Sequence, residues 1–345
     1  MSLPRIAITI GDPAGVGPEI LAKALADRPD GCLPIAIGDR GALVRASQVA
    51  GAKLDWQPVT PPFAQLAPPR TGQAYVYDLD NLTADDYRFG EISAAAGRAA
   101  GESIEQAIRL ALADEVAAVV TNPIHKEAFI LGGYGQRYPG HTEMFADLTG
   151  AKHYCMMLAA GPLRVCHVTT HVSLRRAILD HIKQPRIAEV TRLADQACRR
   201  LGIVSPRIGV AALNPHGGED GTFGDEEITE IKPAIDEVRA EGINADGPVP
   251  ADTLFSKARG GMYDAVVAMY HDQGHIPAKL LGFVYDHQTG EWDMQGVNVT
   301  LGLPIIRTSV DHGTAFDKAG RGIADHRSLL DAIAYAVGLA TGRAR

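Results

Sequence analysis

The chain contains the stretch Asp264-Ala-Val-Val-Ala-Met-Tyr-His-Asp-Gln-Gly-His-Ile-Pro-Ala-Lys279, which joins a short apolar run to several chemically active side chains. The apolar run from Ala265 to Met269 shows no polar alternation, which is typical of a parallel strand that is buried on both faces. His271 and Asp272 follow directly after it. In open α/β sheets, ligands bind outside the carboxyl ends of the strands. The stretch therefore predicts a buried strand that ends in a functional site.

The same pattern, a buried strand followed by polar side chains, recurs along the chain. Apolar runs of strand length occur at residues 5–10, 33–37, 115–120, 154–160, 163–168 and 208–213. Apolar residues at helical spacing predict long helices at residues 94–114, 185–201, 226–241 and 328–340. Strands that alternate with helices predict an α/β fold with mainly parallel strands.

Composition narrows the class of protein. The chain has 345 residues, 46% of them apolar and 21% charged, which is typical of a globular enzyme of one large or two smaller domains. A formal charge of −8 argues against non-specific nucleic-acid binding, which needs a basic excess. Four cysteines without a CxxC pair favour a reducing compartment, and we see neither a signal-peptide layout nor an apolar run of membrane length. We therefore expect a cytoplasmic enzyme with neither nucleic-acid nor membrane partners.

The loop Gly11-Asp-Pro-Ala-Gly-Val-Gly-Pro-Glu19 follows the first predicted strand and leads into a predicted helix. Its glycines allow two interpretations. It is either a tight turn that needs positive φ, or a loop whose backbone N–H groups bind a phosphate or carboxylate. The spacing G-x-x-x-G-x-G differs from the dinucleotide fingerprint. Spacing alone does not decide between the two.

Three histidines, His171, His216 and His271, each follow an apolar run. Three neutral imidazoles suit Zn²⁺, Co²⁺ or Mn²⁺ and leave one coordination position for a substrate. A single histidine is more often structural, so the prediction depends on the three together. His275 is a competing ligand at the i, i+4 spacing of helical zinc sites, but Gly274 and Pro277 argue against a regular helix there.

Other charged residues near these loops have two interpretations each. Lys279 and Arg307 flank apolar runs and could bind a phosphate or carboxylate, although solvated surface charge is the ordinary role of such residues. Asp252 and Asp272 are candidates for a general base, and turn or cap residues are an equally good account. The sequence contains no P-loop, G-x-S-x-G elbow or H-E-x-x-H motif.

Several motifs together resemble the 4-hydroxythreonine-4-phosphate dehydrogenase (PdxA) family. The resemblance covers almost the whole chain, and its clearest motifs are Gly11-Asp-Pro-Ala-Gly-Val-Gly-Pro-Glu19, Gly140-His-Thr-Glu143, Leu213-Asn-Pro-His-Gly-Gly-Glu219, Ala268-Met-Tyr-His-Asp-Gln-Gly274 and Gly296-Val-Asn-Val-Thr-Leu-Gly-Leu-Pro-Ile-Ile-Arg-Thr-Ser-Val-Asp-His-Gly-Thr-Ala315. It implies an α/β fold like that of isocitrate and isopropylmalate dehydrogenases, with two α/β/α lobes and a cleft between them. One lobe would comprise residues 1–140 and 296–345, and the other residues 141–295. It also implies a homodimer whose active site is shared between subunits.

The resemblance assigns roles residue by residue. It implies a divalent metal, Zn, Mg, Co or Mn, on His171, His216 and His271. It implies substrate contacts from His141, Thr142, Lys279, Asn298 and Arg307. It implies that the loop His312, Gly313, Thr314 and Ala315 meets the adenosine end of NAD or NADP. The general base would be Asp252 or Lys279.

The implied reaction is the NAD(P)-linked oxidation of 4-phosphooxy-L-threonine, followed by decarboxylation to 3-amino-2-oxopropyl phosphate, a step of pyridoxine biosynthesis. Three departures from the family pattern concern the substrate. The link between Lys279 and Asn298 is longer than in the vitamin B6 enzymes, and we expect a hairpin there with Thr289-Gly290 as its turn. Asp12 replaces the usual glutamate, and Thr121-Asn-Pro replaces Thr-Gly-Pro.

Because of these departures, other functions stay open. Related enzymes oxidise D-threonate or D-erythronate 4-phosphate, and a more distant one oxidises a cyclic dihydrodiol. A metal-dependent lyase without nicotinamide would use the same histidines but would leave the His312 loop unexplained. A non-catalytic binding protein would make the histidines structural.

Overall fold

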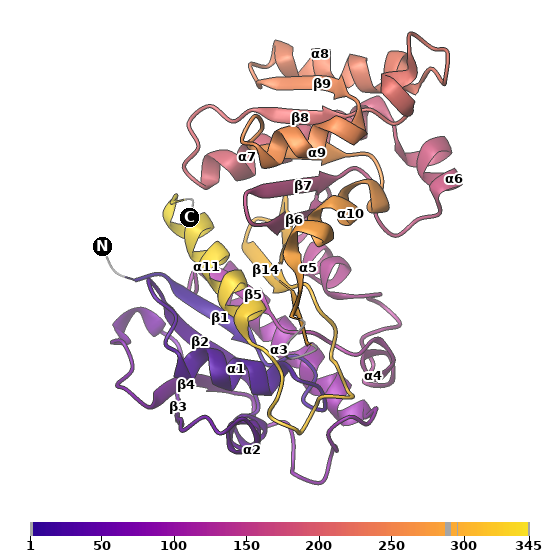
Figure 1. The fold of residues 1–345 in the computed structure, drawn as a ribbon. Coiled ribbons are helices and arrows are strands. Elements are labelled where there is room, and N and C mark those ends of the chain that lie inside the picture. Colours follow the sequence, from indigo (N-terminus) through magenta and orange to yellow (C-terminus); the bar gives the residue numbers. More distant parts are fainter. Residues whose placement is uncertain (1–2, 287–290, 295, 344–345) are drawn as a thin grey trace. The chain divides into compact units, whose positions relative to one another are not determined.

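The computed structural model describes residues 3–286, 291–294 and 296–343, and the chain forms two compact units (Figure 1). The first unit comprises Met1–Lys152 and Leu303–Thr341, and the second comprises His153–Gly302 with the end of the chain after Thr341. The lobe boundaries expected from the sequence lie somewhat earlier in both places. His141 and Thr142 therefore belong to the first unit in the structure.

The first unit is built on a parallel sheet with the strand order β3-β4-β2-β1-β5-β14. Its elements are β1 (Arg5–Thr9), α1 (Gly17–Ala26), β2 (Leu33–Gly38), α2 (Arg40–Ala50), β3 (Asp55–Pro58), η1 (Phe63–Gln65), β4 (Gln73–Asp78), α3 (Ala94–Leu112), β5 (Ala118–Thr121), α4 (Lys126–Leu131), α5 (His141–Thr149), β14 (Ile306–Val310) and α11 (Arg327–Thr341).

Helices cover both faces of this sheet. Helix α3 packs against β1, β2 and β5, whereas α11 packs against β14 and β5 and also contacts α1 (Figure 1). Every residue of β5 and β14 is buried, as expected for strands that are covered on both sides. Covering both faces leaves the ends of the strands as the places where polar side chains can meet a ligand.

The second unit has a mixed sheet with the strand order β13-β6-β7-β10-β8-β9. Strands β13, β6 and β7 pair antiparallel, and β7, β10, β8 and β9 pair parallel. Its elements are β6 (Cys155–Ala160), β7 (Leu163–His167), α6 (Leu174–Arg176), η2 (Ala177–His181), α7 (Gln184–Arg200), β8 (Ile208–Ala211), η3 (Pro215–Gly218), η4 (Glu227–Ile231), α8 (Lys232–Ala240), β9 (Ala245–Val249), α9 (Ala251–Arg259), β10 (Ala265–Ala268), α10 (His271–Gly282), β11 (Phe283–Asp286), β12 (Glu291–Met294) and β13 (Val297–Leu301). The predicted α/β fold with mainly parallel strands is confirmed.

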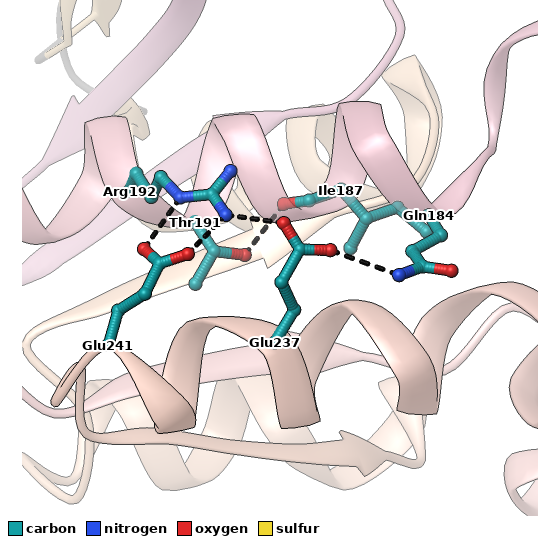
Figure 2. A network of polar contacts seen from close by, with 6 residues as sticks. All are labelled: Gln184, Ile187, Thr191, Arg192, Glu237 and Glu241. Atoms are coloured by element: carbon teal, nitrogen blue, oxygen red, sulfur yellow. Dashed lines mark hydrogen bonds and ion pairs between the residues drawn. The ribbon is translucent and has the colours of Figure 1, made fainter.

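Helices α7 and α8 pack side by side and are joined by charged side chains on their outer faces (Figure 2). Arg192 of α7 donates hydrogen bonds to the carboxylates of Glu237 of α8 and of Glu241, the residue that follows α8. Gln184 donates a further hydrogen bond to Glu237 at 3.0 Å. Exposed ion pairs contribute little to stability individually, so this network mainly sets the register of two helices that bury their apolar faces against the sheet.

Helix α10 corrects one expectation from the sequence. Although Gly274 and Pro277 argued against it, a regular helix runs over His271–Gly282 with Pro277 inside. Tertiary contacts overcome the cost of an interior proline. The buried side chain of Gln273 accepts a hydrogen bond from the Met269 N–H and donates one to the Ala212 carbonyl, both at 2.7 Å. These bonds tie the first turn of the helix to the ends of β10 and β8.

The two arms of the predicted hairpin are confirmed. Strands β11 and β12 pair antiparallel, with Phe283 opposite Met294 and Tyr285 opposite Trp292. The expected turn at Thr289-Gly290 lies outside the described residues. In the part of the chain that the structure describes, no helix is both long enough and apolar enough to span a membrane.

Candidate active site

Polar side chains of the first unit gather at the carboxyl ends of the neighbouring strands β1, β5 and β14. Asp12 follows β1, Asn122 follows β5, and both are fully buried. Asn122 is held by its side-chain amide, which donates to the Thr9 carbonyl at 2.9 Å. Asp12 Oδ2 and Asn122 Oδ1 have no hydrogen-bond partner among the described residues. Buried polar atoms are rarely left without a partner, so such atoms indicate where a ligand completes a site.

Asp12 is also a weaker acid than an ordinary aspartate. Burial raises the pKa of its carboxyl group to about 6, and the N–H of Ala14 and the neighbouring His125 oppose that shift.

Most N–H groups of the glycine-rich loop already donate hydrogen bonds to other atoms of the protein. The N–H groups of Ala14 and Gly15 bond to Asp12, and that of Val16 bonds to the Thr314 carbonyl at 3.0 Å. These bonds favour the structural interpretation of the loop over an anion-binding one.

The Arg307 guanidinium is the central cation of the first unit, and only 4% of its residue surface is exposed. It donates from Nη2 to the Thr121 hydroxyl at 2.9 Å and from Nη1 to the Thr142 hydroxyl at 3.4 Å. Burial lowers its pKa to about 10, and Glu143 opposes this shift. A guanidinium in such surroundings favours binding of an anion, because the anion offsets the loss of water.

His141 lies beside Arg307 at the start of α5. Burial, and secondly the charge of Arg307, lowers the pKa of its imidazole to about 3, so the ring is neutral. Its Nε2 atom is buried and has no hydrogen-bond partner within the described ranges. The structure thus brings together three of the residues expected to bind substrate, His141, Thr142 and Arg307.

The loop expected to bind the cofactor, residues 312–315, packs directly on the glycine-rich loop. A Cβ atom at Gly15 would lie 2.9 Å from the Thr314 carbonyl oxygen, so glycine permits this close approach. His312 Nδ1 is 2.9 Å from the Gly313 carbonyl, and its Nε2 is a buried atom that lacks a partner in the described part of the chain. Ala315 has a φ of +42°, which is uncommon for a residue with a Cβ.

In the second unit, β7, β10 and β8 are adjacent and parallel, and each is followed by one of the predicted metal ligands. His171 follows β7, His271 begins α10 after β10, and His216 lies in η3 after β8. The strand order therefore places all three histidines at one edge of the sheet. The sequence alone could not establish that the three strands are neighbours.

Two of the three histidines, His216 and His271, have the second contact that metal-bound imidazoles usually make. His216 Nδ1 lies 2.7 Å from a carboxylate oxygen of Glu219, and His271 Nδ1 lies 2.7 Å from one of Asp272. A ligating histidine usually donates its other ring N–H to a carboxylate, which orients the ring. The bond to Glu219 also raises the pKa of His216. His216 has a φ of +51°, a strained conformation of the kind that is enriched at functional sites.

The predicted metal ligands do not form a three-ligand cluster among the described residues. The ring centroids of His171 and His271 are 6.1 Å apart, near enough for one ion to contact both rings. However, the described residues hold no group of three or more His, Cys, Asp or Glu side chains that could bind one metal ion. The donor chemistry fits Zn²⁺ or Co²⁺, whereas the single-chain geometry does not supply all three ligands at once.

The remaining expected site residues lie on the second unit. Asp252, in the first turn of α9, is close enough to His216 to contribute to the rise of its pKa. Lys279 of α10 lies 5.5 Å above the ring of Phe283 and contributes to lowering the pKa of His275. Asn298 of β13 donates from its amide to the Met156 sulfur at 3.0 Å, and its Oδ1 is buried with no partner among the described residues.

Sequence reasoning did not single out His167, the last residue of β7. Its ring lies 4.6 Å from that of His275, and burial lowers its pKa to about 3. A histidine inside a strand that is otherwise apolar was the available signal. Asp12 was likewise noticed only as a departure from a motif, although it lies in the loop that follows β1.

Comparisons with known proteins agree on one family. The family model described as "Pyridoxal phosphate biosynthetic protein PdxA" matches residues 30–336. The chain is 46% identical to the D-threonate 4-phosphate dehydrogenase of Cupriavidus necator, with 99% of each chain covered. It is 47% identical to the 4-hydroxythreonine-4-phosphate dehydrogenase of Beijerinckia indica, with 97% of this chain and 94% of that protein covered. The crystal structure of a 4-hydroxythreonine-4-phosphate dehydrogenase from Klebsiella pneumoniae matches with a TM-score of 0.85 and 43% identity, and the match covers 98% of this chain and all of that one.

Proposed function

Because this chain belongs to the PdxA family, we propose that it is an NAD(P)-dependent dehydrogenase that oxidises a secondary alcohol of a phosphorylated hydroxy acid. The two relatives compared above are named for D-threonate 4-phosphate and for 4-hydroxythreonine 4-phosphate, so the substrate is a four-carbon acid with a terminal phosphate. The hairpin formed by β11 and β12, which lengthens the link between Lys279 and Asn298, favours the sugar-acid phosphate.

The buried cluster of Arg307, Thr142 and His141 carries this proposal. Arg307 would pair with the phosphate, and the Thr142 hydroxyl would donate a further hydrogen bond to it. His141 stays neutral at physiological pH, so its ring can make a hydrogen bond to the substrate without adding charge. The orphaned polar atoms of His141 and His312 support the same assignment, because a bound substrate and cofactor would give them partners.

A divalent metal on His171, His216 and His271 would polarise the substrate hydroxyl and lower its pKa. NAD or NADP, contacting the loop from His312 to Ala315, would supply the hydride acceptor. Glu219 and Asp272 hold the rings of His216 and His271 through their Nδ1 atoms, which leaves Nε2 for the metal. Asp252 or Lys279 takes the hydroxyl proton. Asp252 is favoured by its position beside His216.

We further propose that the enzyme is a homodimer with a shared active site. Residues 171 and 216 are exposed and 271 is partly exposed, which suits ligands that are completed by a second copy. A single chain lacks a complete three-ligand cluster in its described residues, as noted above. Sedimentation should give a dimer. A monomer with full activity and full metal content would contradict the shared site.

The proposed function is tested by NAD(P)H absorbance after mixing the protein with NAD⁺ or NADP⁺, a divalent metal and a substrate. The substrates are 4-phosphooxy-L-threonine, D-threonate 4-phosphate and D-erythronate 4-phosphate, with unphosphorylated D-threonate as the matched control. We expect a signal only with phosphorylated acids, and the strongest with a sugar-acid phosphate. The strongest signal with the amino acid would instead place the protein in pyridoxine biosynthesis. Substrate loss without NAD(P)H would contradict the dehydrogenase and favour a metal-dependent lyase.

A further inference from the structure

Three imidazole rings of the second unit form a column that begins at the predicted metal ligand His271. The ring of His275 is stacked on that of His271, with centroids 3.7 Å apart and an interplanar angle of 8°. The ring of His167 lies behind His275 at 4.6 Å and 47°. His271 is partly exposed, whereas His275 and His167 are 8% and 1% exposed. The column thus runs from the protein surface into the core.

Each inner ring is fixed by contacts of its own. His275 Nδ1 donates to the carbonyl of His271 at 3.0 Å, and His167 Nδ1 lies 3.4 Å from the carbonyl of Met156. A Cβ atom at Gly274 would lie 2.4 Å from His167 Nε2. Only glycine at position 274 allows the His167 ring to lie beneath the first turn of α10. The inner rings are therefore rigid parts of the core.

Burial argues against His275 as a metal ligand. Its ring lies under the ring of His271, and only 8% of the residue surface is exposed. Meanwhile the ring of His271 is held on two sides. Asp272 contacts its Nδ1 edge at 2.7 Å, and His275 covers one of its faces. Neither of these two contacts involves Nε2 of His271, so this atom stays accessible to a metal ion.

We propose that His275, backed by His167, is a positioning residue that holds the His271 ring in the orientation required for metal binding. This inference rests on the metal-dependent function proposed above. A ligand ring that is already oriented loses less conformational freedom when the metal binds, so the affinity is higher. A flat partner is needed for this contact, because only a planar ring can cover the face of His271 at 3.7 Å.

The test is Co²⁺ binding by the metal-free full-length protein, measured by competition with a chromophoric chelator and by the visible absorption of bound Co²⁺. The variant His275→Leu fills the space without a flat ring, and His275→Phe retains a flat ring but lacks the Nδ1 donor. Loss of contacts behind a metal ligand typically weakens binding about 10–100-fold. We expect a loss of this size and an altered Co²⁺ spectrum for His275→Leu, with most of both restored in His275→Phe.

Two reference variants separate the possible outcomes. His271→Ala should abolish this binding, and His153→Ala, at an exposed histidine of the same unit, should leave it unchanged. Wild-type affinity and spectrum in a folded His275→Leu variant, together with loss in His271→Ala, would overturn the positioning role alone. Equal Co²⁺ binding by wild type and His271→Ala would overturn both the metal site and the inference that rests on it. Circular dichroism confirms that each variant is folded.

Discussion

Arg307 Nη2 donates a hydrogen bond to the hydroxyl of Thr121 at 2.9 Å, and both side chains are buried between neighbouring parallel strands. Thr121 is the last residue of β5, and Arg307 is the second residue of β14. The bond fixes the guanidinium inside the unit instead of leaving it on the surface. Its position next to His141 makes it a candidate anion-binding group of the first unit.

Thr121→Val should raise the KM of the phosphorylated substrate about tenfold to a hundredfold. A hydrogen bond to a charged group is worth about 1.5–3 kcal/mol, and its loss leaves the guanidinium less well oriented. Thr308→Val is the matched control, because Thr308 is equally buried but its hydroxyl bonds to the Ala332 carbonyl of α11. Steady-state kinetics checks this prediction. An equal KM in the two variants would show that Thr121 does not orient Arg307.

His216→Asn should abolish turnover and leave the melting temperature within about 2 °C of wild type. Asparagine tolerates the positive φ of this position, so the change removes the imidazole without adding backbone strain. The side chain is largely exposed and contributes little to core packing. Bound zinc measured by atomic absorption should fall in parallel. Normal activity in the variant would refute the role of His216 as a metal ligand.

His141 should make the protein less stable in acid. Its folded-state pKa of about 3 lies below the ordinary value of 6.5, so the unfolded chain binds the proton more readily. Stability is therefore complete above pH 6.5 and falls as the pH drops from there toward 3. Between pH 7.5 and pH 5 this single group accounts for roughly 2 kcal/mol. His141→Gln should lose correspondingly less stability on acidification, and the same slope in both proteins would contradict the assignment.

Asp12→Asn should stabilise the protein at alkaline pH. Burial raises the pKa of Asp12 to about 6, so the folded state prefers the protonated carboxyl group. The contribution to stability is complete below the ordinary pKa of 3.8 and is lost as the pH rises through about 6. The variant should therefore melt above wild type at pH 8, with a difference that shrinks toward pH 4. A constant difference across this range would show that the Asp12 charge is not the cause.

Glu19→Gln should weaken the attachment of the segment that follows the proposed cofactor loop. Glu19 of α1 is fully buried and accepts hydrogen bonds from the N–H groups of Gly320 and Gly322. The variant replaces one acceptor oxygen by an NH2 group and leaves one of these N–H groups without its partner, which should cost about 1–3 kcal/mol of stability and raise the KM of the cofactor but not of the substrate.

Glu227→Gln in the second unit is the control for this change. Glu227 is buried and accepts from the N–H groups of Leu213 and Asn214, so its loss should cost similar stability without changing the KM of the cofactor. A higher cofactor KM in both variants would indicate a general loss of stability instead of a displaced cofactor loop.

Local patterns in the sequence were enough to predict the long helices and several of the buried strands. The apolar run at Ala265–Ala268 is a strand, and the helical spacing after residue 93 is helix α3. These features depend on side-chain periodicity, which is local. Residues 40–50, which form α2, were missed because the apolar signal is weak there. That helix is fixed instead by the Asp39 cap, which accepts from the Ala42 N–H, and by Gly51 at its end.

The candidate site could be identified only from the sequence and the tertiary structure together. The positions of His171, His216 and His271 after apolar runs were visible in the sequence, because strand ends are marked by the change from apolar to polar residues. Only the tertiary structure decided that β7, β10 and β8 are neighbours, because strand order depends on pairings between distant segments. Likewise, α10 is a helix despite Pro277, because its first turn is bonded to the ends of two other strands.

The sequence by itself determined the α/β class, the family resemblance and the residue types available for chemistry. The tertiary structure decided which of those residues meet, and it buried the His275 ring against the His271 ring where the spacing alone allowed His275 to be a ligand. The physical reason is that periodicity and turn chemistry act over a few residues. Burial, strand order and the pKa shifts that follow from burial instead arise only when segments far apart in the chain are packed together.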